Sequence, residues 1–106
     1  MLKRPRNDLV LNNLAWIFLT AKDKKLRNIK KGLQLAKKSV DIFPTVDNLD
    51  TLAEAYFQSG EIKKAINIIR KAVKEVFYNP NRQKYLRKQF LRFQNGKQNT
   101  PPPALS

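Results

Sequence analysis

The chain lacks cysteine and histidine, although it is 106 residues long. Without cysteine it can form no disulfide framework and no thiolate metal site. Without histidine it lacks the commonest general base and the commonest metal ligand. Its three glycines, Gly32, Gly60 and Gly96, are scattered, so no glycine-rich loop could cradle a phosphate. These absences predict a protein that is not an enzyme and that holds neither a metal nor a cofactor.

Acidic residues are scarce as well. The chain has 8 acidic and 22 basic residues, which gives a formal net charge of +14. Such an excess favours acidic partners, namely nucleic acid, an anionic lipid surface or an acidic protein. A lysine-rich solvated surface would have the same composition, so both interpretations stay open.

Long apolar runs are also missing, and no stretch reaches the 18 residues expected of a membrane span. The first 21 residues, MLKRPRNDLVLNNLAWIFLTA, imitate a signal peptide with a basic start and an apolar middle. Asn12 and Asn13 interrupt that middle, and Leu19 is large where a small residue should precede a cleavage site. We therefore interpret this segment as a helix and favour a cytoplasmic location.

The chain does contain 42% hydrophobic residues, enough for the core of one domain. Within 61–77 the apolar residues recur at helical spacing, with lysines and an arginine between them. A matching stripe precedes them, and Gly60 lies between the two, where glycine closes a helix in the left-handed conformation. We expect nearly all stripe residues in the core of an all-α fold with five helices. These are placed at about 8–21, 29–43, 46–58, 61–77 and 80–95.

The helical stripes repeat along the chain. LNNLAWIF (11–18) superposes on LDTLAEAY (49–56) with an offset of 38, and GLQLAKKSV (32–40) superposes on AINIIRKAV (65–73) with an offset of 33. The difference predicts a five-residue insertion in the first unit. It should form an exposed loop at 22–28, with Asn28 capping the helix that follows. NRQKYLRKQF, beginning at Asn81, is a third partial copy at an offset of 34.

This period and pattern resemble the tetratricopeptide repeat, a helix-turn-helix unit of 34 residues. The family pattern has a large residue, a leucine followed by a small residue and an aromatic in the first helix. Two small residues flanking a bulky one follow in the second helix. The second unit matches with Leu49, Leu52, Ala53, Tyr56, Ala65, Ile69 and Ala72. The first unit matches with Leu11, Leu14, Ala15, Phe18, Gly32, Ala36, Ser39 and Pro44. Leucine replaces the usual tryptophan, and Pro80 comes three residues late.

The resemblance implies a helix-turn-helix repeat solenoid, similar to the closing repeats of longer bacterial tetratricopeptide proteins. Arg87 stands where the earlier copies have Ala15 and Ala53, which gives the last helix the polar outer face of a cap. We divide the chain into a basic N-terminal segment, a repeat domain and a flexible tail containing Pro101–Pro103. Their bounds are 1–7, 8–95 (units 8–45 and 46–79, capping helix 80–95) and 96–106.

In the family, the first helix of each unit lines a concave groove. Carried over to this chain, the groove would hold Asn12, Trp16, Asp47, Asp50, Glu54, Phe57, Lys84, Lys88 and Arg92. Its acidic and basic residues could bind a partner of mixed charge, or pair with each other. A pair such as Glu54 with Lys88 would be worth less than about 1 kcal/mol at an exposed surface. Trp16 is either an anchor for a partner or part of the core.

The second helices of the family form the convex back. Here this back would gather Lys30, Lys31, Lys37, Lys38, Lys63, Lys64, Lys71 and Lys74. These lysines could attract nucleic acid through its phosphates without reading bases. The sequence thus predicts a non-catalytic scaffold that binds another protein, with electrostatic binding of nucleic acid or an anionic surface as the alternative. Self-stacking through Leu9, Trp16 or Ile17 on the outer side of the first helix is a further possibility.

Overall fold

The computed structural model of this chain describes residues 6–96 and 101–103. Residues 1–5 of the predicted N-terminal segment and residues 97–100 and 104–106 of the predicted tail therefore lie outside the described residues. The described part contains five α-helices and no β-strand, which confirms the predicted all-α fold. The helices are α1 (Asn7–Thr20), α2 (Ile29–Ile42), α3 (Val46–Gln58), α4 (Ile62–Glu75) and α5 (Pro80–Asn95).

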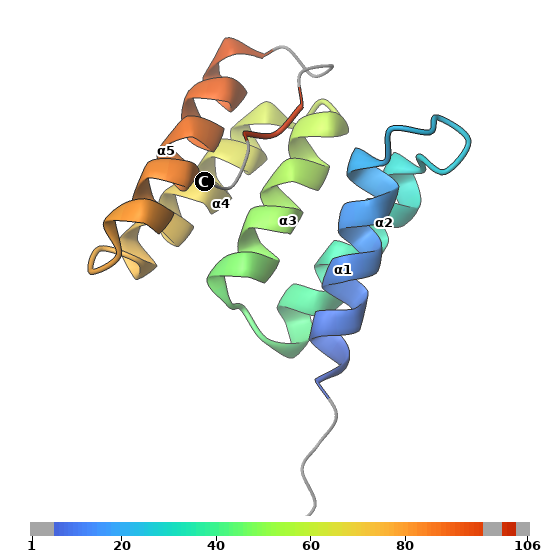
Figure 1. Ribbon diagram of the computed structural model, residues 1–106, viewed down its shortest axis with the longest axis horizontal. Coiled ribbons are helices and arrows are strands. Elements are labelled where there is room, and N and C mark those ends of the chain that lie inside the picture. Colours follow the sequence, from blue (N-terminus) through green and yellow to red (C-terminus); the bar gives the residue numbers. More distant parts are fainter. Residues whose placement is uncertain (1–5, 97–100, 104–106) are drawn as a thin grey trace, which may run out of the picture.

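The helices form two layers, with α1, α3 and α5 side by side in front and α2 and α4 behind (Figure 1). Consecutive helices pack against each other, and α1 also packs on α3. The rings of Phe57 on α3 and Phe93 on α5 lie 4.7 Å apart, which joins the last helix to the front layer. The first, third and fifth helices thus share one face of the molecule.

The helix ends follow local chemistry. The side chain of Asn28 accepts a hydrogen bond from the backbone nitrogen of Lys31 at 3.0 Å, and the preceding residues 22–28 are exposed, which confirms the predicted loop and its cap. Asn79 caps α5 in the same way. Gly60 has a φ of 87° just after α3. At this angle a residue with a side chain would be strained, so glycine suits the turn.

Small residues of the repeat pattern let the paired helices approach closely. Ala15, Ala53 and Ala65 are fully buried. A Cβ atom added to Gly32 would lie 2.8 Å from Cγ of Leu19, so α1 and α2 have no room for a larger residue there.

Two clusters of buried residues make the core. One contains Phe57, Ile69 and Phe93 from α3, α4 and α5, and the other contains Leu19 and Ala36 together with residues of α3. Tyr56 and Ile68 pack against both clusters. The two hairpins are therefore joined by a continuous apolar contact.

The outer side of α1 departs from the prediction that nearly all stripe residues are core. Leu14 corresponds to Leu52 in the repeat alignment, but it is 40% exposed where Leu52 is 7% exposed. Val10 is 66% exposed. The reason is that α1 packs on α2 and α3 only, so no described helix covers its other side. No helix in residues 6–96 is both long and apolar enough to cross a membrane.

Candidate functional site

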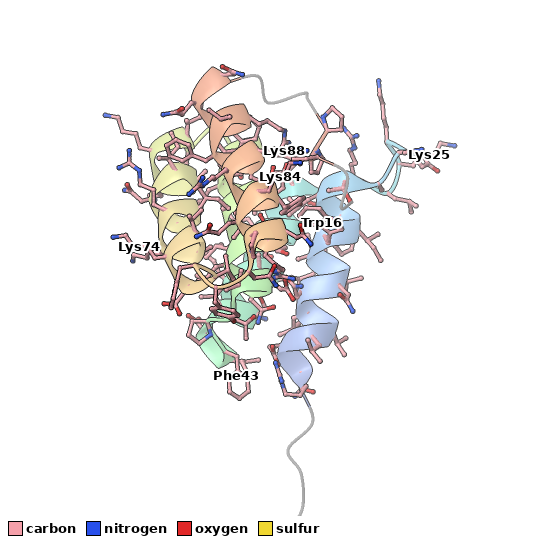
Figure 2. All side chains as sticks on the ribbon, turned by 60° about the vertical axis from the view of Figure 1, so that its left-hand side comes forward. Trp16, Lys25, Phe43, Lys74, Lys84 and Lys88 are labelled. Atoms are coloured by element: carbon pink, nitrogen blue, oxygen red, sulfur yellow. The ribbon has the colours of Figure 1, made fainter. Side chains whose placement is uncertain are left out.

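A cavity of about 1020 Å³ lies where α1, α3 and α5 meet on the front layer. We call it the front groove. Figure 2 shows Trp16 of α1 close to Lys84 and Lys88 of α5. Six of the nine predicted groove residues line this cavity. They are Asn12, Trp16, Asp47, Asp50, Lys84 and Lys88.

The other three predicted groove residues do not line the front groove. Phe57 is fully buried against Phe93, so its prediction as a groove residue is wrong. Its side chain is part of the core between α3, α4 and α5. The guanidinium of Arg92 covers the Phe57 ring at 4.8 Å from the ring centroid, and Glu54 is fully buried as well.

Glu54 and Arg92 form a buried ion pair. Nη1 of Arg92 donates to Oε1 of Glu54 at 2.6 Å, and Nη2 donates to Oε2 at 2.7 Å. The expected exposed pair between Glu54 and Lys88 is therefore wrong. The planar guanidinium presents two parallel N–H groups to the two carboxylate oxygens, whereas a lysine presents a single point charge.

Gln89 links this ion pair to Asp50. Its Nε2 donates to Oε1 of Glu54 and to Oδ1 of Asp50, both at 3.1 Å, and its Oε1 accepts from Nη1 of Arg92 at 2.6 Å. The side chain is fully buried, so it holds these polar groups in one network between α3 and α5. Of the four residues in this network, only Asp50 also lines the front groove.

Asp50 is the buried acid of the front groove, with 9% of its surface exposed. Burial raises the pKa of its carboxyl group to about 7; the hydrogen bond from Gln89 opposes this, and the charges of Glu54 and Asp47 add to it. Asp50 has no ion pair with any residue in 6–96 or 101–103. The groove therefore contains an acid for which the described chain supplies no cation.

Further polar groups lie on both sides of the groove, beside the apolar side chains of Leu9, Ile17 and Leu86. Asp47 forms an ion pair with Arg82 at the exposed rim. On α1, Oδ1 of Asn12 is buried and has no hydrogen-bond partner within the described residues. Burial, the charges of Asp50 and Glu54 and a hydrogen bond to Asp50 raise the pKa of Tyr85, so its hydroxyl keeps its proton and acts as a donor to Asp50. A ligand in the groove would meet acceptors from α1 and α3 beside the ammonium groups of α5.

The eight predicted lysines of the convex back are all exposed on α2 and α4, the rear layer. Figure 2 shows Lys74 on the side of the molecule away from Trp16. Among these lysines, only Lys64 forms an ion pair within the described residues, with Glu61 at 3.0 Å. The basic back and the front groove are therefore separate surfaces.

A second polar network was not predicted from the sequence. Nε of Arg6 donates to Oδ1 of the buried Asp8 at 2.8 Å, and Nδ2 of Asn48 donates to Oδ2 of Asp8 at 2.9 Å. The hydrogen bonds from Arg6 and Asn48 lower the pKa of the Asp8 carboxyl group to about 2, although burial alone would raise it. This network ties the start of α1 to α3. An acid in the first helical turn looks like an ordinary response to the helix dipole, so the sequence carries no signal of its burial.

No group of three or more potential metal ligands occurs in the described part of the chain. Comparisons of the sequence with protein-family models and with curated proteins, and of the structure with solved structures, find no match. The arguments on function therefore rest on the geometry of the front groove and of the basic back.

Proposed function

We propose that this chain is a non-catalytic module that binds another protein through the front groove. In this proposal the fold is a short solenoid of two tetratricopeptide-like hairpins, α1–α2 and α3–α4, closed by α5. The shared front layer of α1, α3 and α5 supports it, because the first helices of such repeats line one face. The polar face of α5, where Arg87 is exposed, is what a terminal repeat needs for solubility.

The observation that carries the proposal is the convergence of Trp16, Asp50, Lys84 and Lys88 on one cavity of about 1020 Å³. Tryptophan is enriched at the energetic centres of protein interfaces, because its large ring buries much apolar surface. Trp16 is only half buried here, so a partner could cover the remainder. A groove that also offers charges of both signs suits a peptide segment better than a small apolar ligand.

The groove also indicates the chemistry of the partner. Asp50 is buried without a cation, and Asn12 has an unused acceptor beside the same cavity. Both favour a partner segment with a hydrogen-bond donor, and an ammonium or guanidinium group would also neutralise Asp50. The basic rim formed by Lys84 and Lys88 would accept acidic groups on the same segment. We therefore propose a partner of mixed charge.

The test is affinity capture of partners by the full chain, followed by quantitative mass spectrometry and affinity measurement on the captured protein. Trp16→Ala should weaken partner binding about 30-fold or more, as expected for an interface centre worth 2 kcal/mol or more. Leu26→Ala is the matched control, because Leu26 is 55% exposed in the 22–28 loop, outside the groove. Equal binding by wild type and Trp16→Ala would overturn the proposal.

The exposed lysines support a second candidate function, electrostatic binding of nucleic acid or an anionic surface. Seven of the eight lack an ion pair in the described residues, so their charges are available. Binding of a duplex oligonucleotide should then fall steeply and linearly in log affinity against log salt concentration. Replacing Lys37, Lys38, Lys63 and Lys64 by Glu should abolish it, while Trp16→Ala should leave it unchanged. Weak binding without a salt slope would exclude this second function.

A further inference from the structure

The chain places a segment of its own tail in the front groove. Pro102 and Pro103 line the same cavity as Trp16, and both prolines are partly buried, whereas Pro101 is exposed and does not line it. Figure 1 shows the segment 101–103, in red, running across the front layer beside α3. The cavity is thus formed by three helices together with a non-helical segment from the end of the chain.

Proline is well suited to such a position. It has no backbone N–H to leave unsatisfied, and its fixed φ lowers the entropy lost when the segment is ordered. Consecutive prolines favour the extended polyproline II conformation, and aromatic-lined grooves are a common docking site for it. The front groove supplies two aromatic side chains, Trp16 and Tyr85.

The connection to α5 keeps the segment close to the groove. Gly96 ends α5 with a φ of 68°, and only four residues, 97–100, separate it from Pro101. A tether of this length gives an effective concentration in about the millimolar range. A segment that would bind only weakly as a separate peptide can therefore occupy the groove within the chain.

From these observations we infer that residues 101–103 are an intramolecular ligand of the front groove, and that the groove recognises extended proline-containing segments. The inference rests on the proposed function of the groove as a binding site. A partner that uses the groove must displace Pro102 and Pro103. The tail therefore lowers the apparent affinity of the groove for its partner.

Trp16 makes the inference directly testable, because it is the only tryptophan in the chain. Its fluorescence reports on the groove without any label. In the full chain, Pro102→Gly with Pro103→Gly should shift the Trp16 emission to longer wavelength and increase its quenching by acrylamide. Pro101→Gly is the matched control and should behave as wild type. Equal emission and quenching in all three proteins would overturn the inference.

A synthetic peptide of residues 97–106 provides the second measurement. It should bind the Pro102→Gly, Pro103→Gly variant and restore its emission, and its affinity for wild type should be at least about tenfold lower because the groove is already occupied. Equal affinity for the two proteins, or no binding to the double variant at millimolar peptide, would overturn the inference.

The two proposals fail in different ways. The binding of a captured partner to Trp16→Ala tests whether the groove binds other proteins at all. The fluorescence of the proline variants tests only whether the tail occupies it. A captured partner that binds the Pro102→Gly, Pro103→Gly variant more tightly than wild type is the result expected if both proposals hold.

Discussion

Arg92 on α5 and Glu54 on α3 face each other in a two-pronged ion pair. Each terminal nitrogen of the guanidinium group donates to one oxygen of the carboxylate, at 2.6 and 2.7 Å. Glu54 is fully buried, and only 9% of the Arg92 side chain is exposed. The pair lies under the front groove and next to the stacked rings of Phe57 and Phe93. It therefore contributes to the docking of α5 rather than to the binding surface.

Removing one partner of this pair should destabilise the protein strongly. We expect Arg92→Leu to lower the free energy of unfolding by about 3–5 kcal/mol, because it leaves the carboxylate of Glu54 buried without its cation. The double variant Glu54→Leu, Arg92→Leu should lose less free energy of unfolding than Arg92→Leu alone, because it leaves no unpaired charge. Urea unfolding followed by circular dichroism measures both.

The exposed ion pair between Arg82 and Asp47 is the control for this prediction. Arg82→Ala should cost less than about 1 kcal/mol, since both side chains are largely in water. Similar losses for Arg82→Ala and Arg92→Leu would contradict the distinction between an exposed and a buried pair.

The sequence predicted the helices correctly but not the ion-pair partner of Glu54, which is Arg92 and not Lys88. Helix positions, the cap at Asn28 and the turn at Gly60 depend on neighbouring residues. The spacing of apolar residues and the capping chemistry of Asn28 were therefore sufficient to predict them. Lys88 and Arg92 lie one turn apart on the same face of α5. Which of them reaches Glu54 depends on how far α5 is displaced along α3.

That displacement is set by packing between residues far apart in the sequence. Phe57 and Phe93 stack in the core and fix α5 against α3. The alignment of repeats placed Phe57 on the groove face, because it takes no account of the size and orientation of a particular ring. The burial of Asp50 and Glu54 also follows from this packing between distant residues. The repeat alignment therefore predicted which helices form the candidate site, but not how deeply these acids are buried.

Gly32 tests how tightly α1 and α2 pack. In Gly32→Ala the new methyl group would lie 2.8 Å from Cγ and Cδ2 of Leu19, which is itself buried and cannot swing away. Overpacking should cost about 1–3 kcal/mol, and alanine's better helix propensity returns at most about 1 kcal/mol. We therefore expect Gly32→Ala to lower the midpoint temperature of thermal unfolding. Gln34→Ala, at an exposed position of the same helix, should change stability by less than about 0.5 kcal/mol.

Asn48 should be required for the attachment of α1. Its Nδ2 donates to Oδ2 of Asp8 and to the carbonyl of Phe43, each at 2.9 Å. Asn48→Ala removes both bonds and should cost about 1–3 kcal/mol. Hydrogen exchange should show faster opening of the first turns of α1 while α4 and α5 stay protected. Uniform acceleration across all five helices would instead mean that this network does not act locally.

Asp50 should make the stability of the protein depend on pH near neutrality. Its carboxyl pKa is raised from 3.8 to about 7 in the folded chain, so the folded state binds a proton that the unfolded state has released. The stabilisation is complete below about pH 4 and is lost as the pH rises through about 7. The free energy of unfolding should therefore fall over this window, by an amount on the order of 3 kcal/mol.

Asp50→Asn removes this titration while keeping a side chain of the same size beside Gln89. Its free energy of unfolding should change little between about pH 4 and about pH 7, and at about pH 8 it should exceed that of wild type, because no charge has to be buried. Asp47→Asn, at the exposed rim, should keep the wild-type slope. Urea unfolding at intervals across this range measures the slopes. Identical slopes for wild type and Asp50→Asn would show that folding does not raise the pKa of Asp50, which would contradict this prediction.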